Sequence, residues 1–105
     1  MKIVIIGTGN TAFVLGRLIK ERGHSIIQVI GRNTAESNRL SRVLDCPSVN
    51  ELSAIDETAE LYIVAVSDRA IESISKSLNL KKGILVHTAG SVSKEVLQGG
   101  CRNYG

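Results

Sequence analysis

The feature that most constrains the fold is a glycine-rich turn between a strand-like and a helix-like segment. Residues 2–6 read KIVII, a β-branched run typical of a strand that is covered on both faces. GTGNTA follows at once at residues 7–12, and apolar residues recur at helical spacing over residues 11–22. This is the G-x-G-x-x-A form of the dinucleotide-binding fingerprint, in the strand–turn–helix context that it requires. The pattern predicts a nucleotide-binding turn at the start of an α/β chain.

Each small residue of this turn has its own role in holding a pyrophosphate. Gly7 permits the tight turn, Gly9 lets a phosphate approach the backbone, and Ala12 lets the helix pack closely on the sheet. The first backbone N–H groups of the helix, together with its dipole, favour negative charge. We therefore expect the pyrophosphate to contact the whole turn: Gly7, Thr8, Gly9, Asn10, Thr11 and Ala12.

The rest of the chain alternates between strand and helix periods. Strands are predicted over residues 25–30, 61–66 and 84–87, the last entered by a turn at Lys82-Gly83, with a very short strand near Val49. Helices are predicted from an N-cap at Thr34 to Leu44, from Ser67 or Asp68 to Leu78, over residues 93–98, and briefly from Asn50. Repeated βαβ units indicate a doubly wound parallel sheet in three layers.

Composition excludes several classes of protein. The 105 residues are enough for one domain, and 43% hydrophobic residues with a net charge of +3 argue against disorder. Only three aromatic residues are present, so we expect no nucleic-acid stacking platform. No apolar run approaches the roughly 20 residues of a membrane span, and the strand-like start at Lys2 leaves no room for a signal peptide. We expect a cytoplasmic protein that binds neither nucleic acid nor membrane.

The cysteines and the end of the chain carry two further expectations. Cys46 and Cys101 match no metal or redox spacing, so no metal site is predicted. Residues 101–105 read as the approach to another element. We therefore expect residues 1–105 to form one dinucleotide-binding domain that lacks a last strand and belongs to a longer, two-domain protein. A sheet edge left without its neighbour would favour self-association or a marginally stable monomer.

The end of the second strand indicates which dinucleotide binds. A site for NAD usually places Asp or Glu there to bind ribose hydroxyls, but residues 25–35 contain no acid. Instead the chain offers Arg32, Asn33 and Thr34, whose guanidinium, amide and hydroxyl groups suit a 2′-phosphate. The charge pattern favours NADP as the cofactor. A methyltransferase that binds S-adenosylmethionine would suit the glycine turn but not Arg32.

Two more loops leave the carboxyl ends of strands, where ligands bind in open α/β sheets. The first loop consists of Ala65, Val66, Ser67 and Asp68, and it should flank the adenosine and the pyrophosphate. Asp68 is equally suited to capping a helix. The second should lie toward the nicotinamide and consists of His87, Thr88, Ala89 and Gly90. His87 could donate a proton, although a packed histidine with one hydrogen bond is the commoner case.

These segments resemble a known protein family. GTGNTA, GRNTA, YIVAVSD followed by AI, and HTAGSVS are similar to the N-terminal domain of bacterial Rossmann-like proteins with a C-terminal helical domain of unknown function. Those proteins resemble pyrroline-5-carboxylate reductase and the deazaflavin-dependent NADP oxidoreductases. The resemblance covers residues 2–105 and implies a Rossmann-like NADP-binding fold, an oxidoreductase role, and a homodimer formed through the helical domain.

Two functions remain open at this stage. The first is the cofactor domain of an NADP-dependent oxidoreductase, which passes hydride between NADPH and a small carbonyl or imine substrate. The alternative is a non-catalytic NADP-binding module, such as a redox sensor or an assembly domain. It gains support because no Lys, Tyr or carboxylate stands out as a proton donor.

Overall fold

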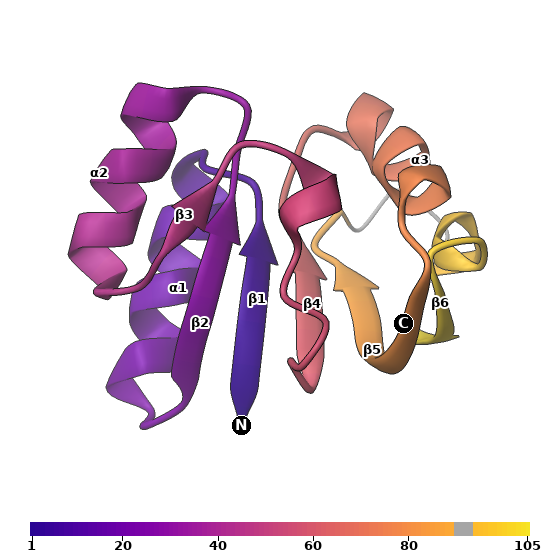
Figure 1. The fold of residues 1–105 in the computed structure, drawn as a ribbon, viewed down its shortest axis with the longest axis horizontal. Helices are drawn as coiled ribbons and strands as arrows, with labels where there is room; N and C mark the ends of the chain where they lie inside the picture. Colours follow the sequence, from indigo (N-terminus) through magenta and orange to yellow (C-terminus); the bar gives the residue numbers. More distant parts are fainter. Residues whose placement is uncertain (90–93) are drawn as a thin grey trace.

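A single parallel sheet with helices on both faces forms the body of the molecule. The computed structural model describes residues 1–89 and 94–105 (Figure 1). Its elements, in chain order, are β1 (Lys2–Ile6), α1 (Asn10–Glu21), β2 (Ser25–Ile30), α2 (Thr34–Leu44), β3 (Ser48–Val49), the 3-10 turn η1 (Leu52–Ala54), β4 (Leu61–Val64), α3 (Asp68–Ser77), β5 (Leu80–His87), the 3-10 turn η2 (Lys94–Leu97) and β6 (Cys101–Tyr104). The strand order is β3-β2-β1-β4-β5-β6 and all neighbours are parallel. This confirms the predicted doubly wound α/β fold.

Alternation along the central strand separates two hydrophobic cores. Ile3 and Ile5 of β1 belong to the core that α1 and α2 cover, together with Leu40. Val4 and Ile6 belong to the opposite core, which Ile71 of α3 closes. Successive side chains of a strand point to opposite faces, so an unbroken apolar run such as KIVII needs a covering layer on each side. The three predicted layers follow from this pattern and are visible in Figure 1.

The end of the chain differs from the prediction. Cys101–Tyr104 forms β6, a sixth strand beside β5, where the sequence predicted only the approach to another element. The Leu80 N–H donates to the Gly100 carbonyl at 2.8 Å, and the Gly105 N–H donates to the Leu85 carbonyl at 2.8 Å. An edge strand needs hydrogen bonds on one side only, so a short segment with little apolar character can form one when its neighbour is already in place.

The predicted turn at Lys82-Gly83 lies inside β5. The strand begins at Leu80, and its register with β6 shifts between Leu80 and Ile84. Gly83 has φ 81°, and a Cβ on it would lie 2.9 Å from the Ala59 carbonyl oxygen. The glycine therefore marks a strand irregularity where the backbone passes close to a neighbouring loop.

Three predicted helix boundaries also changed. The N-cap of α2 is Asn33 rather than Thr34, because the Asn33 Oδ1 accepts the Glu36 N–H at 3.1 Å. The helix expected from Asn50 is the 3-10 turn η1, and the helix expected over residues 93–98 is the 3-10 turn η2, with Ser93 outside the described residues. Both segments are shorter than a stable isolated helix requires, so tertiary contacts determine their form.

Candidate functional site

A cavity of about 940 Å³ opens at the carboxyl ends of the strands, beside the neighbouring strands β1 and β4. From β1 the strand order runs outward to β2 and β3, and from β4 it runs outward in the opposite direction to β5 and β6. The segments that follow β1, β2 and β4 line it, together with the start of the β3–β4 loop and one face of α3. Open α/β sheets bind ligands at this switch point, and the volume lies within the range of small-molecule sites.

The glycine turn forms one wall of the cavity. The Gly7 N–H donates to the Ile30 carbonyl at 2.8 Å, which ties the turn to the end of β2. Gly7 has φ 125°, a conformation that favours glycine. A Cβ on Gly9 would meet no atom within 4 Å, so this residue presents bare backbone to open space. Gly7, Thr8, Gly9, Asn10 and Thr11 line the cavity, whereas Ala12 is a buried residue of α1 and does not line it. The predicted contacts of these six residues with a pyrophosphate stay predictions.

The start of α1 differs from the starts of the other two α-helices of the described chain. Gly9 is its N-cap and supplies no side-chain cap, and no acidic residue lies in the first turn. In contrast, Asn33 caps α2 and Asp68 lies in the first turn of α3. The first intrahelical bond of α1 runs from the Phe13 N–H to the Gly9 carbonyl at 3.0 Å. The preceding backbone N–H groups are therefore available to an anion.

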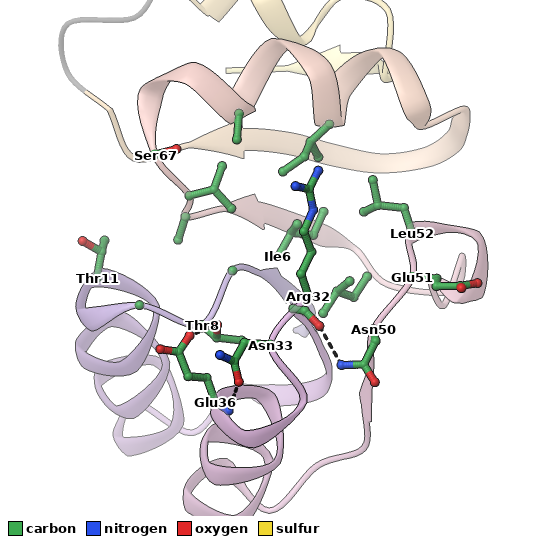
Figure 2. A pocket seen from close by; sticks show the side chains of 18 of the residues that line it. Ile6, Thr8, Thr11, Arg32, Asn33, Glu36, Asn50, Glu51, Leu52 and Ser67 are labelled. Atoms are coloured by element: carbon green, nitrogen blue, oxygen red, sulfur yellow. Dashed lines mark hydrogen bonds between the residues drawn. The ribbon is translucent and has the colours of Figure 1, made fainter.

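The loop after β2 places a cation at the cavity. Arg32 lies at its border and directs its side chain between η1 and α3 (Figure 2). Asn33 also lines the cavity, but its Oδ1 is occupied in capping α2. Thr34 is the first residue of α2 and does not line the cavity.

Glu36 was missed as a site residue by the sequence analysis. Its carboxylate lines the cavity and accepts a hydrogen bond from the Thr8 Oγ1 at 3.1 Å (Figure 2). Glu36 is the first residue after the acid-free stretch of residues 25–35. The sequence feature that could have indicated Glu36 is its position in the first turn of α2, because this helix starts from the same sheet edge as the glycine turn.

The loop after β3 was also missed. Asn50, Glu51, Leu52 and Ser53 line the cavity. The Asn50 Nδ2 donates to the Gly31 carbonyl at 2.7 Å and to the Ser37 Oγ at 3.1 Å, which joins this loop to the end of β2. No local pattern in the sequence indicates these contacts.

Of the loop after β4, Ala65, Val66 and Ser67 line the cavity, whereas Asp68 does not. Asp68 begins α3, and the residue at the N-cap position is Ser67, which makes no side-chain cap hydrogen bond.

None of the described residues at the end of β5 and in the loop after it lines the cavity. His87 pairs with Val64 at the end of β5, and its Nδ1 accepts the Ala89 N–H at 3.1 Å. The Thr88 N–H donates to the Val64 carbonyl at 3.3 Å. His87, Thr88 and Ala89 are absent from the cavity lining, and Gly90 lies outside the described residues. The roles assigned to these four residues stay predictions.

The family can be stated from a direct match. Residues 2–90 match the model of the family described as "NADP oxidoreductase coenzyme F420-dependent". The chain belongs to this family. The match covers all the cavity-lining segments, from the glycine turn to α3. The domain is thus the NADP-binding Rossmann domain of an oxidoreductase family.

Solved structures place this family domain within larger proteins. The putative NADP oxidoreductase BF3122 from Bacteroides fragilis is 30% identical, with a TM-score of 0.87, over 99% of this chain and 42% of its own. The 1-pyrroline-5-carboxylate reductase from Streptococcus pyogenes has the same fold, at 23% identity and a TM-score of 0.74, over 96% of this chain and 38% of its own. The chain therefore spans about two fifths of these relatives. No curated protein matches it.

Two features are absent from residues 1–89 and 94–105. No group of three or more His, Cys, Asp or Glu side chains could hold a metal ion in this part of the family domain. None of the helices there combines the length and apolar character needed to cross a membrane.

Proposed function

We propose that the chain binds NADP(H) in this cavity and is the cofactor domain of an NADP-dependent oxidoreductase. Its task is to hold the dinucleotide so that hydride passes between nicotinamide C4 and a small carbonyl or imine substrate. One observation carries the proposal: the uncapped start of α1 opens onto the cavity that also receives Arg32.

The pyrophosphate is assigned to the glycine turn. The backbone N–H groups at the start of α1 donate to phosphate oxygens, and the absence of a side chain on Gly9 leaves room for close approach. The positive end of the helix dipole adds a favourable interaction with the same charge.

The adenosine side is assigned to the loop after β2. Arg32 carries a permanent positive charge and can donate two parallel hydrogen bonds to a phosphate. The 2′-phosphate distinguishes NADP from NAD, so this guanidinium is the source of any preference for the phosphorylated cofactor.

A non-catalytic NADP-binding module remains a second candidate, and the cavity lining favours it. The described residues around the cavity include no His, Lys, Tyr or Cys to serve as a proton donor. Its acidic side chains, Glu36 and Glu51, are both exposed, so the described lining offers no buried acid for this role. Oxidation of NADPH by small carbonyl or imine compounds, assayed with a protein that also contains the remainder seen in the relatives, separates the two candidates.

Titration of the Arg32→Gln variant with NADPH and NADH tests the cofactor assignment. Loss of a charged hydrogen-bond donor should raise the Kd for NADPH roughly 10- to 100-fold and leave the Kd for NADH within about twofold. Arg42→Gln, at the exposed far end of α2, removes the same charge and serves as the matched control. Failure of the parent chain to bind either nucleotide, or equal Kd values for NADPH in all three proteins, would overturn the proposal.

A further inference from the structure

The carboxylate of Glu36 lies on the same side of the cavity as the residues assigned to the adenosine ribose. Glu36 is three residues after Asn33 and is joined to the glycine turn by the 3.1 Å hydrogen bond from Thr8 (Figure 2). Thr8 in turn packs on the end of β2, since a Cβ on Gly31 would lie 2.3 Å from the Thr8 Cγ2. Thr8, Gly31 and Glu36 thus form one contiguous surface beside Arg32.

The cavity is not a basic site, although the whole chain carries a net charge of +3. The ionisable side chains among its described lining residues are one cation, Arg32, and two carboxylates, Glu36 and Glu51. Glu51 accepts from the Ser53 Oγ at 3.4 Å and lies at the η1 side, across Arg32 from Glu36 in Figure 2. Glu36 is therefore the acid positioned at the junction of the glycine turn and the β2 loop.

A carboxylate at this position has opposite effects on the two nucleotides. It repels the charge of a 2′-phosphate, which opposes the attraction of Arg32. It accepts hydrogen bonds from ribose hydroxyls, which NAD presents at both the 2′ and 3′ positions. Glu36 is exposed, so the effect is screened by solvent and salt but not abolished.

From this geometry we infer that Glu36 is a specificity-determining residue that limits the preference for NADP(H) over NAD(H). Arg32 favours the phosphorylated cofactor, Glu36 favours the free ribose, and the site accepts both nucleotides with moderate discrimination. This inference rests on the proposed function, because it assigns Glu36 a role in the same nucleotide site.

The test compares Kd values for NADPH and NADH in the parent chain and in Glu36→Gln. The glutamine keeps a side-chain oxygen that can accept from Thr8 but removes the charge. The ratio of the Kd for NADH to the Kd for NADPH should rise about tenfold, mainly through tighter NADPH binding. Glu36→Lys, which places a cation there, should shift the ratio further in the same direction. Added salt should reduce the difference between the parent and Glu36→Gln in NADPH binding.

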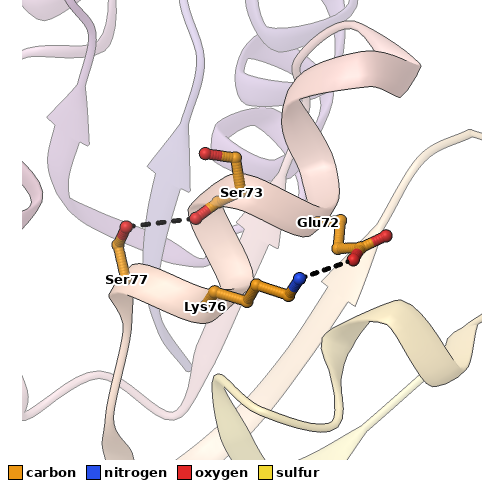
Figure 3. A network of polar contacts seen from close by, with 4 residues as sticks. All are labelled: Glu72, Ser73, Lys76 and Ser77. Carbon is orange, nitrogen blue, oxygen red and sulfur yellow. Dashed lines mark hydrogen bonds and ion pairs between the residues drawn. The ribbon is translucent and has the colours of Figure 1, made fainter.

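Glu72→Gln is the matched control for net charge. Glu72 lies on the exposed surface of α3, where it forms an ion pair with Lys76 at 2.8 Å (Figure 3), and it is not part of the cavity lining. This variant should leave the ratio of Kd values within about twofold of the parent. An unchanged ratio in both Glu36 variants, with NADPH still bound, would overturn the inference and leave the proposed function intact. Absence of nucleotide binding in the parent chain would overturn the proposed function itself.

Discussion

A Cβ atom added to Gly7 would lie 2.1 Å from the carbonyl oxygen of Ala65, so the turn after β1 and the end of β4 meet backbone to backbone. The Ala65 N–H also donates to the Ile6 carbonyl at 2.8 Å, which continues the pairing of the two strands to the edge of the cavity. The floor of the candidate nucleotide site is therefore formed by two main chains with no side chain between them.

Gly7 and Gly9 should consequently respond differently to alanine. Gly7→Ala combines an unfavourable backbone conformation with a steric clash and should lower the free energy of unfolding by roughly 3 kcal/mol or more. Gly9→Ala should cost less than about 1 kcal/mol, because its Cβ meets no protein atom. Its methyl group would instead face the assigned pyrophosphate and weaken NADPH binding at least about tenfold. Denaturant unfolding and nucleotide titration measure both effects, and normal NADPH binding by Gly9→Ala would contradict this assignment.

The close contact between Gly31 and Thr8 should appear as an energetic coupling. Gly31→Ala places a methyl group 2.3 Å from the Thr8 Cγ2 and should destabilise the protein by roughly 1–3 kcal/mol. Thr8→Ser removes the Cγ2 but keeps the hydroxyl that donates to Glu36. The double variant should regain most of the loss, with a coupling of about 1 kcal/mol or more in a double-mutant cycle of unfolding free energies. If the changes in unfolding free energy of the two single variants simply add in the double variant, the added methyl group at position 31 and the Thr8 Cγ2 do not compete for this space.

The loop that carries residues 50–53 depends on one buried amide. The Gln28 Nε2 donates to the Ala54 carbonyl at 3.0 Å, and its Oε1 accepts the Asp56 N–H at 2.8 Å. Gln28→Leu removes both hydrogen bonds but leaves the Ala54 carbonyl and the Asp56 N–H in place, and it should lower the free energy of unfolding by roughly 2–3 kcal/mol. Tyr62→Phe removes the single bond from the Tyr62 hydroxyl to the Asp56 carbonyl and should cost only about 1 kcal/mol. Denaturant unfolding compares the two; a larger loss in Tyr62→Phe would refute the assigned role of Gln28.

The thiol of Cys46 should be slow to react. Burial raises the pKa of Cys46 from 9.0 to about 11, and the nearby Lys20 opposes this only in part. At pH 8 its thiolate fraction, and hence its alkylation rate in the folded state, should be roughly 100-fold below that of an unperturbed thiol. Mass spectrometry after iodoacetamide treatment in a Cys101→Ser background checks this rate, and the denatured chain provides the reference. Equal rates in the folded and denatured states would contradict the prediction.

The same shift has a consequence for stability. The folded state disfavours the thiolate, so the contribution of Cys46 is fully present below pH 9 and is lost as the pH rises toward about 11. The free energy of unfolding should therefore decline over this range in the parent chain, and less steeply in Cys46→Ser, as measured by denaturant unfolding at each pH.

Local patterns were sufficient to predict the first part of the fold. The apolar run of β1, the glycine turn and the start of α1 are encoded within residues 2–22, and each depends on the backbone preferences and periodicity of neighbouring residues. The alternation of Ile3 and Ile5 with Val4 and Ile6 likewise indicated a layer on each face. Arg32 could be placed at the cavity because the carboxyl ends of parallel strands meet at one edge.

Tertiary structure decided the remainder. Glu36 joined the site through a bond to Thr8, and Gln28 shaped the cavity loop through a bond to Asp56; each pair is separated by 28 residues. β6 formed because β5 was available to pair with it. Within β5, a neighbouring loop leaves no room for a side chain at Gly83. The sequence by itself determined β1, the glycine turn, α1, β2 and the layer on each face of the sheet, since these properties depend on adjacent residues. Which distant side chains share the cavity is determined only when the layers pack, because those contacts have no counterpart in any local pattern.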